Sequence, residues 1–186
     1  VNPLYTPREL EHQLKDAGVD TIVILENFAG VLEDVIARTP VKNVVIAAIG
    51  DMLGFPKSLI VNFVVRKIKK MVPPWHLPGH TRFNDTLALG SKQPLRKVAL
   101  GHDDIAFLQY TGGTTGVAKG AMLLHKNIVA NMLQAGEWVK PVVREGQEIL
   151  ITALPLYHIF SLTAHLMVFT ELGALNVLIT NPRDIP

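Results

Sequence analysis

Cysteine is absent from the 186 residues, and charged side chains are scarce. Without cysteine the chain cannot form a disulfide framework, a thiolate zinc site or a cysteine nucleophile, and its composition fits a cytoplasmic protein. Charged residues make up 18%, below the roughly 25% usual in soluble domains, and their formal balance is only +2. Because this excess is small, we expect no nucleic-acid partner. A hydrophobic content of 48% and a mean hydropathy of +0.28 exclude disorder for most of the chain.

The ends of the chain also lack typical features. Val1 and Asn2 supply neither an initiator methionine nor a positively charged leader, and residues 181–186 have the composition of a loop. The length is that of one domain or a large subdomain. We therefore expect an internal piece of a longer protein.

Residues 149–170 contain no Asp, Glu, Lys or Arg, and their 22 residues are long enough to cross a bilayer. Pro155, His158 and His165 interrupt the stretch, and such residues are costly in lipid. The same residues divide naturally into a strand, a loop and a helix. We favour that division over a membrane span.

Hydrophobic periodicity predicts alternating helices and strands in residues 1–50. Thr6, Pro7 and Glu9 form a capping box at a helix start, and Gly18 ends that helix. Residues 21–25 and 43–48 are apolar runs typical of buried strands, and apolar spacing over residues 28–36 predicts a helix between them. This alternation predicts an α/β fold: a layered, mostly parallel sheet flanked by helices on both faces.

The pattern resumes at residue 100. We expect strands at residues 105–110, 120–124, 149–154 and 175–180, and helices marked by Ile128 to Val139 and by residues 161–172. The last strand–helix–strand unit is a complete βαβ. The chain is therefore divided into a first α/β segment (1–50), a basic amphipathic insert and linker (51–99), and a second α/β segment (100–186).

The insert differs in kind from its surroundings. From Met52 to Asn84 there are six basic residues and no acidic one, and apolar residues fill most of positions 59–71. A basic amphipathic helix at residues 57–70, with Trp75 nearby, is typical of a membrane-surface element. The alternative is a helix that packs its apolar face on the sheet. Seven consecutive positions from Leu59 to Val65 contain only one polar residue, which favours packing.

Residues 109–121 are the most informative stretch. A predicted strand runs into Tyr110 and Thr111, and the loop residues Gly112, Gly113, Thr114, Thr115, Gly116, Val117 and Ala118 lead to Lys119, Gly120 and Ala121. Glycines let backbone N–H groups approach an anion, threonine hydroxyls add donors, and the lysine adds a positive charge. The pattern predicts a phosphate site. It is not a Walker loop, because no Gly-Lys-Ser/Thr sequence precedes a helix. The alternative is a hairpin loop without a ligand.

These residues resemble the phosphate-loop signature of the adenylate-forming acyl-activating enzymes. Residues 107–110, 154–160 and 179–184 are similar to the bacterial long-chain fatty-acid–CoA ligases, and residues 2–11 resemble an early segment of the same family. Gly113 and Ala118 depart from the wider superfamily pattern, where Ser and Pro are frequent, and both departures match the bacterial long-chain subgroup. The resemblance covers essentially the whole chain, least securely residues 54–80.

The resemblance implies an acid–thiol ligase with ATP, Mg²⁺ and CoA. A fatty carboxylate attacks the α-phosphate of ATP, pyrophosphate leaves, and the thiol of CoA converts the acyl-adenylate into a thioester. Residues 110–121 would hold the ATP phosphates, and Tyr157 and His158 would lie at the acyl and adenylate end of the pocket. The family's magnesium-binding glutamate, ribose-binding aspartate and C-terminal lysine have no counterpart in these 186 residues. We therefore expect no complete catalytic set, no metal ligand and no ligase activity in this chain alone.

Without the motif match, the chemistry of histidine favours structural roles for these side chains. A lone His in an apolar segment is more often a hydrogen-bonded core residue than a site residue, and only the motif match favours a site role for His158. His165 is expected to be structural. His76, His80, His102 and His125 have no metal-ligand spacing.

Three rival functions remain beside the ligase: a nucleotide-phosphate binding module, another acyl- or aryl-activating adenylating enzyme, and a peripheral membrane-interaction module. We expect a cytoplasmic protein, peripheral on the inner face of the cell membrane if the basic stretch binds lipid. Exposed sheet edges favour self-association, so a homo-oligomer is a further expectation.

Overall fold

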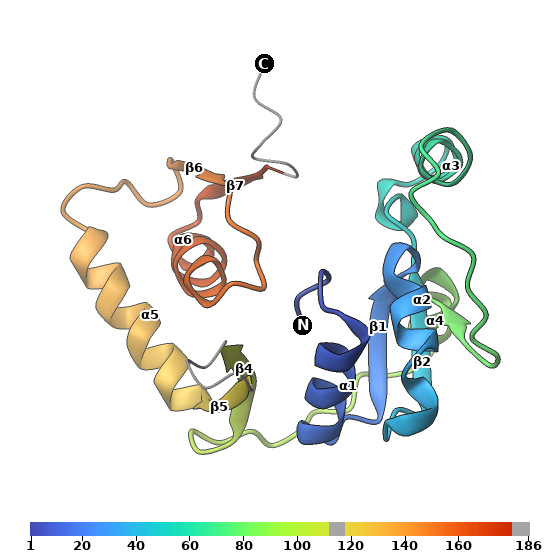
Figure 1. Cartoon of the computed structure of the whole chain (residues 1–186). Helices are drawn as coiled ribbons and strands as arrows, with labels where there is room; N and C mark the ends of the chain where they lie inside the picture. The colour runs from blue at the N-terminus through green and yellow to red at the C-terminus, as the bar shows by residue number, and fades with distance from the viewer. Residues whose placement is uncertain (112–117, 180–186) are drawn as a thin grey trace. The chain divides into compact units, whose positions relative to one another are not determined.

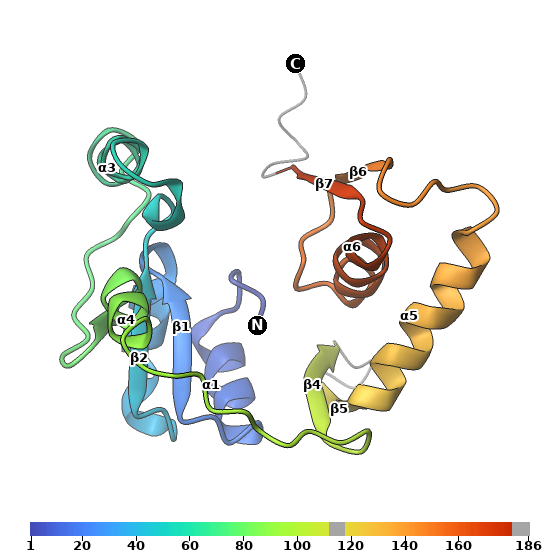
Figure 2. The same ribbon diagram turned by 180° about the vertical axis from the view of Figure 1, so that it is seen from behind.

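The computed structural model describes residues 1–111 and 118–179. The chain divides into two compact units, Val1–Val98 and Ala99–Pro186. Helices and strands alternate within each unit (Figures 1 and 2). The α/β class predicted from the sequence is confirmed.

The first unit contains a three-stranded parallel sheet in the order β1-β2-β3. Ile22 of β1 is in register with Val44 of β2, and Ile24 is in register with Ile46. The elements of this unit, in chain order, are α1 (Pro7–Asp16), β1 (Thr21–Leu25), η1 (Glu26–Phe28), α2 (Ala29–Glu33), η2 (Ile36–Arg38), β2 (Asn43–Ala47), η3 (Asp51–Leu53), α3 (Lys57–Phe63), η4 (Val64–Ile68), β3 (Thr81–Arg82) and α4 (Phe83–Gly90).

Apolar residues of α1, α2 and one sheet face form the core of the first unit. Alternate residues of a strand point to the same face, so Ile22, Val44 and Ile46 meet the helices together. The remaining core residues are Leu10, Leu14, Ala29, Leu32, Val35 and Leu77. Apolar residues of the stretch 28–36 therefore pack in the core, as their spacing predicted.

Two expectations for this unit are corrected. The single helix predicted over residues 28–36 is broken into η1, α2 and η2, because the chain packs Leu32 and Val35 against the sheet through short turns. The sheet is also not fully covered on both faces: α4 contacts β2 and β3, but Val23 on the edge strand β1 is 61% exposed. Val23 alternates with Ile22 and Ile24, so it points to the other face, where α4 lies against β2 and β3.

The capping box predicted at the start of α1 is confirmed. The Thr6 hydroxyl accepts a hydrogen bond from the Glu9 N–H at 3.4 Å, and a Glu9 carboxylate oxygen accepts one from the Thr6 N–H at 2.8 Å. Pro7 occupies the first helical turn, and Gly18 follows the helix with a φ of 61°. A positive φ of this kind favours glycine, as the sequence predicted.

The cap makes the stability of α1 depend on pH. Hydrogen bonds from Thr6 hold the pKa of Glu9 below its ordinary value. A carboxyl with a lowered folded-state pKa stabilises the fold above its unfolded pKa, about 4.3, and this stabilisation is lost as the pH falls through the lower folded value. We expect Thr6→Ala to lower the chemical-denaturation midpoint at neutral pH and to flatten its decline in acid. The prediction would be contradicted if the midpoint of Thr6→Ala fell as steeply in acid as the midpoint of the parent.

The second unit contains a hairpin and a βαβ unit. The hairpin consists of β4 (Ile105–Thr111) and β5 (Lys119–Leu124), which pair antiparallel. The helix α5 (His125–Val139) follows and packs against both β5 and η5 (Ser161–Val168). The βαβ unit is built from β6 (Ile149–Thr152), the continuous helix of η5 and α6 (Phe169–Glu171), and β7 (Leu175–Leu178), with β6 and β7 parallel.

The antiparallel β4–β5 pair is the exception to the parallel sheet expected from the sequence. Only seven residues separate Thr111 from Lys119. A parallel connection needs a crossover of a dozen or more residues, so a linker this short permits only a hairpin.

Candidate functional site

The β4–β5 hairpin presents both ends of the predicted phosphate loop. Thr111 is paired with Lys119, and Tyr110 is paired with Gly120. Directly opposed residues of an antiparallel pair point to the same face, so Thr111 and Lys119 share one face and Tyr110 the other. Lys119 is exposed, as a cation that meets a solvated anion must be. A strand and not a helix follows Lys119, in agreement with the exclusion of a Walker loop.

The centre of the predicted loop, Gly112, Gly113, Thr114, Thr115, Gly116 and Val117, lies outside the described residues. Its assignment to the ATP phosphates stays a prediction, as do those of Tyr110, Thr111, Ala118, Lys119, Gly120 and Ala121. The described ends show only that the loop closes a hairpin whose last pair brings Lys119 opposite Thr111.

Close packing of Tyr110 on Gly120 distinguishes the base of the hairpin. A Cβ atom added to Gly120 would lie 2.9 Å from Cε2 and 2.9 Å from Cζ of the Tyr110 ring. Real Cβ contacts are longer than this, so the ring occupies the space that any larger residue at position 120 would need. Glycine at this position therefore lets the ring lie across the strand next to the loop.

Tyr157 and His158 lie where the sequence placed them, between the carboxyl end of the parallel strand β6 and the start of η5. Tyr157 is 41% exposed, and His158 is also exposed. The His158 ring Nδ1 accepts a hydrogen bond from the Phe160 N–H at 3.3 Å, and the His158 N–H donates to the Pro155 carbonyl at 2.9 Å. Open α/β sheets bind ligands at this edge. The acyl and adenylate role of both residues stays a prediction.

Ser161 and His165 support this loop, and sequence reasoning did not single out Ser161. Ser161 is fully buried, and its hydroxyl donates to the Leu154 carbonyl at 2.9 Å and lies 3.1 Å from the His165 Nδ1. Phe160 packs edge-on to the His165 ring at 5.5 Å between centroids. The two residues are four apart on one helix, a spacing that could have revealed the pair. The expectation that His165 has a structural contact agrees with this geometry.

The part of the chain that the structure describes shows no group of three or more His, Asp or Glu side chains placed to hold a metal ion. Within the same residues no helix is both long and apolar enough to span a membrane. The strand, loop and helix expected for residues 149–170 are present instead.

Three comparisons relate the chain to known proteins. A long-chain-fatty-acid–CoA ligase of Escherichia coli O6:H1 is 54% identical over 186 residues, which are all of this chain and 33% of that protein. The 4-coumarate–CoA ligase 1 of Solanum tuberosum is 27% identical over 99% of this chain and 29% of its own length. The crystal structure of a long-chain-fatty-acid–CoA ligase from Archaeoglobus fulgidus matches 96% of this chain and 29% of its own, with a TM-score of 0.66 and 22% identity.

The chain thus spans about a third of the length of the curated relatives that it matches. The structural likeness, at 22% identity, supports the fold. The family model described as AMP-binding enzyme matches residues 1–186 without interruption. This chain therefore belongs to the AMP-binding enzyme family.

Proposed function

We propose that this chain is part of a long-chain fatty-acid–CoA ligase. The observation that carries the proposal is the 54% identity to the Escherichia coli long-chain ligase over every residue of the chain. The 4-coumarate–CoA ligase matches nearly as much of the chain at half that identity. This difference favours a fatty acid over an aryl acid as the substrate.

In the proposed reaction the fatty carboxylate attacks the α-phosphate of ATP, and pyrophosphate leaves as the acyl-adenylate forms. The CoA thiol then displaces AMP to give the thioester. Negative charge gathers on phosphate oxygens in the first step, and positioned N–H, hydroxyl and ammonium donors stabilise it. The hairpin supports this role, since its pairing places Lys119 beside the loop that carries the glycines and threonines. Mg²⁺ would neutralise phosphate charge, and its ligands would come from outside this chain.

The experiment that tests the proposal is fatty-acid-dependent pyrophosphate release by the full-length protein. Palmitate, 4-coumarate and no acid are compared with ATP and Mg²⁺ present, and thioester formation is then measured after CoA is added. We expect release with palmitate only. Release with 4-coumarate alone would favour the aryl-activating alternative. ATP binding without release under any condition would favour a nucleotide-phosphate binding module.

The cellular location and assembly are further proposals. We propose a cytoplasmic protein that is peripheral on the inner face of the cell membrane, and the support is the run of basic and apolar residues from Lys57 to Lys70. A homo-oligomer is proposed because β1 is an edge strand and its Val23 is exposed. Light scattering of the full-length protein tests the oligomer, and a monomer at all concentrations contradicts it.

Close packing at the base of the hairpin gives a testable prediction. We expect Gly120→Ala to lower fatty-acid-dependent pyrophosphate release several-fold, because the new methyl group displaces the Tyr110 ring next to the phosphate loop. The matched control is Gly136→Ala on α5, where no atom lies within 4 Å of the added Cβ. The control should keep full activity. Equal activity in both variants would contradict a role for the Tyr110 position.

A further inference from the structure

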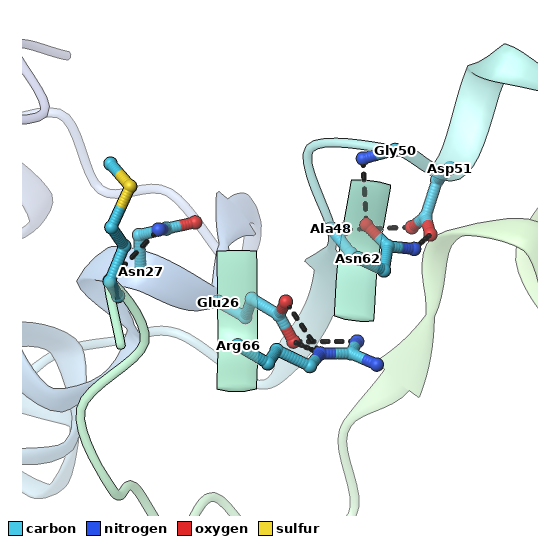
Figure 3. Close-up of polar contacts among 8 residues, drawn as sticks. Glu26, Asn27, Ala48, Gly50, Asp51, Asn62 and Arg66 are labelled. Atoms are coloured by element: carbon cyan, nitrogen blue, oxygen red, sulfur yellow. Dashed lines mark hydrogen bonds and ion pairs between the residues drawn. The ribbon is translucent and has the colours of Figure 1, made fainter. Parts of the chain in front are cut away.

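The helix formed by α3 and η4 points two polar side chains toward the rest of the first unit. Asn62 Oδ1 accepts the Gly50 N–H at 2.8 Å, and Asn62 Nδ2 donates to Asp51 Oδ1 at 3.3 Å. Arg66, four residues later, binds the Glu26 carboxylate through Nε at 2.8 and 3.0 Å and through Nη2 at 2.8 Å (Figure 3). Residues four apart lie on one side of a helix, so Asn62 and Arg66 make a single polar contact surface.

Two further hydrogen bonds position the partners of this helical segment and the chain that follows it. Asp51 Oδ2 accepts the Ala48 N–H at 2.8 Å directly after β2. Beyond the helix, Asn27 Nδ2 donates to the Met71 carbonyl at 2.9 Å (Figure 3). Val65, the buried apolar residue of the segment, lies on the same inward side. Polar partners at Asn62, at Arg66 and at the Met71 carbonyl therefore fix the orientation of the helix.

The side of the helix next to Asn62 and Arg66 carries apolar side chains that face solvent. Leu59, Ile60 and Phe63 are each 59–62% exposed, and their spacing places them on one side. Other exposed apolar residues precede and follow the helix: Met52, Leu53, Phe55, Ile68 and Met71. A helix that covers a core would turn these residues inward. The expectation that the apolar face of this stretch packs inward holds for Val65, which is buried, and not for Leu59, Ile60 and Phe63.

Positive charge accompanies this apolar side. Lys57, Lys67, Lys69 and Lys70 are exposed, and they form no ion pair with any residue that the structure describes. The nearby acids, Glu26 and Asp51, are occupied on the inward side by Arg66 and Asn62. From Met52 to Asn84 the sequence contains no other acidic residue that could neutralise the lysines.

We propose that α3 and η4 dock on an anionic lipid surface. Leu59, Ile60 and Phe63 enter the boundary between headgroups and acyl chains, and the four lysines contact lipid phosphates. Bulky apolar side chains on one face with lysines around them are the chemistry of an interfacial helix. The hydrogen bonds of Asn62 and the ion pair of Arg66 hold that face outward before any lipid is met. The proposal specifies which residues make the peripheral contact proposed above, and it does not depend on ligase chemistry.

The test uses the full-length protein and sedimentation with two kinds of vesicle. One kind contains phosphatidylglycerol and phosphatidylethanolamine, and the other contains phosphatidylcholine alone. We expect binding to the anionic vesicles at low salt that weakens at high salt, and much weaker binding to the neutral vesicles. Equal binding to both kinds of vesicle would overturn the electrostatic part of the proposal, and no binding to either would overturn the whole.

Two variants separate the apolar and charged contributions. Leu59→Ser/Ile60→Ser/Phe63→Ser and Lys67→Gln/Lys69→Gln/Lys70→Gln should each weaken vesicle binding by about ten-fold or more. The matched controls are Leu87→Ser/Leu89→Ser on α4, which removes exposed leucines, and Lys92→Gln/Arg96→Gln/Lys97→Gln, which removes exposed charges. Controls that lose as much binding as the helix variants would overturn the assignment to this helix.

The remaining measurements separate three outcomes: a variant that does not fold, a protein without ligase activity, and a helix face that another part of the protein covers. All substituted residues are exposed, so circular dichroism and pyrophosphate release with micelle-free fatty acid should match the parent. A parent protein that binds anionic vesicles but releases no pyrophosphate would count against the ligase proposal only. Maleimide labelling of Phe63→Cys without vesicles, located by peptide mass, should be fast and should slow on anionic vesicles. Protection without vesicles would show that another part of the protein covers this face and would overturn the proposal.

Discussion

Lys119→Ala in the full-length protein is expected to lower fatty-acid-dependent pyrophosphate release by about 10- to 100-fold. The lysine is exposed and is paired through its backbone with Thr111, so the substitution removes a positive charge without removing core packing. A charge-assisted hydrogen bond to a phosphate oxygen contributes roughly 1.5–3 kcal/mol, from which the expected factor follows. The assay is pyrophosphate release with palmitate and ATP as substrates.

The control for this variant is Lys126→Ala, which removes an exposed lysine of α5 that is ion-paired with Asp103. It should leave release unchanged. Thr114→Ala and Thr115→Ala should lower release by less than Lys119→Ala, because each removes a neutral donor. The assignment of residues 110–121 to the ATP phosphates is wrong if all three loop variants release pyrophosphate at the parent's rate.

Arg66→Met is expected to destabilise the first unit by about 2–3 kcal/mol. Glu26 is only 5% exposed, and the variant leaves its carboxylate without the three hydrogen bonds from the guanidinium. Removing one partner of a buried pair is costly because the other charge stays desolvated. Arg66 itself is about a third exposed, at 36%, which places the cost at the lower end of the usual range. The pair also raises the pKa of Arg66, chiefly through its hydrogen bonds to Glu26.

Chemical denaturation gives the size of this loss, and hydrogen exchange gives its location. Amides of α3 and η4 should lose protection first, since Arg66 anchors that helix. Glu26→Gln/Arg66→Met should recover much of the stability, because a neutral amide is cheaper to bury than an unpaired carboxylate. Arg38→Met, which removes an exposed partner of Glu11, should hardly move the midpoint. A midpoint for Arg66→Met equal to that of Arg38→Met would contradict the prediction.

Local signals in the sequence predicted much of this fold. The α1 cap, the parallel strands β1 and β2, the strand into Tyr110 and the final βαβ unit follow from neighbours a few residues apart. Strand β3 and helix α4 were not predicted, because two strand residues and a short helix carry little periodic signal inside a segment that resembles a linker. The antiparallel hairpin could have been deduced from its seven-residue connection.

The candidate site was also predicted in part from the sequence and in part only from the structure. Its loop chemistry and the positions of Tyr157 and His158 come from residue types and motifs along the chain. The packing of Tyr110 on Gly120 and the contact of Ser161 with the Leu154 carbonyl depend on side-chain placement, which no motif expresses.

The sequence by itself determined the α/β class, the family and the basic, apolar character of residues 57–70. Only the tertiary structure decided which way that helix faces. Periodicity shows that a helix has an apolar side but not where that side points, and core packing is the usual assumption. Here Glu26 and Asp51 lie at the ends of the strands, more than ten residues away in sequence from their partners Arg66 and Asn62. Their hydrogen bonds with Arg66 and Asn62 turn the polar side inward, and the exposed apolar residues are left facing outward.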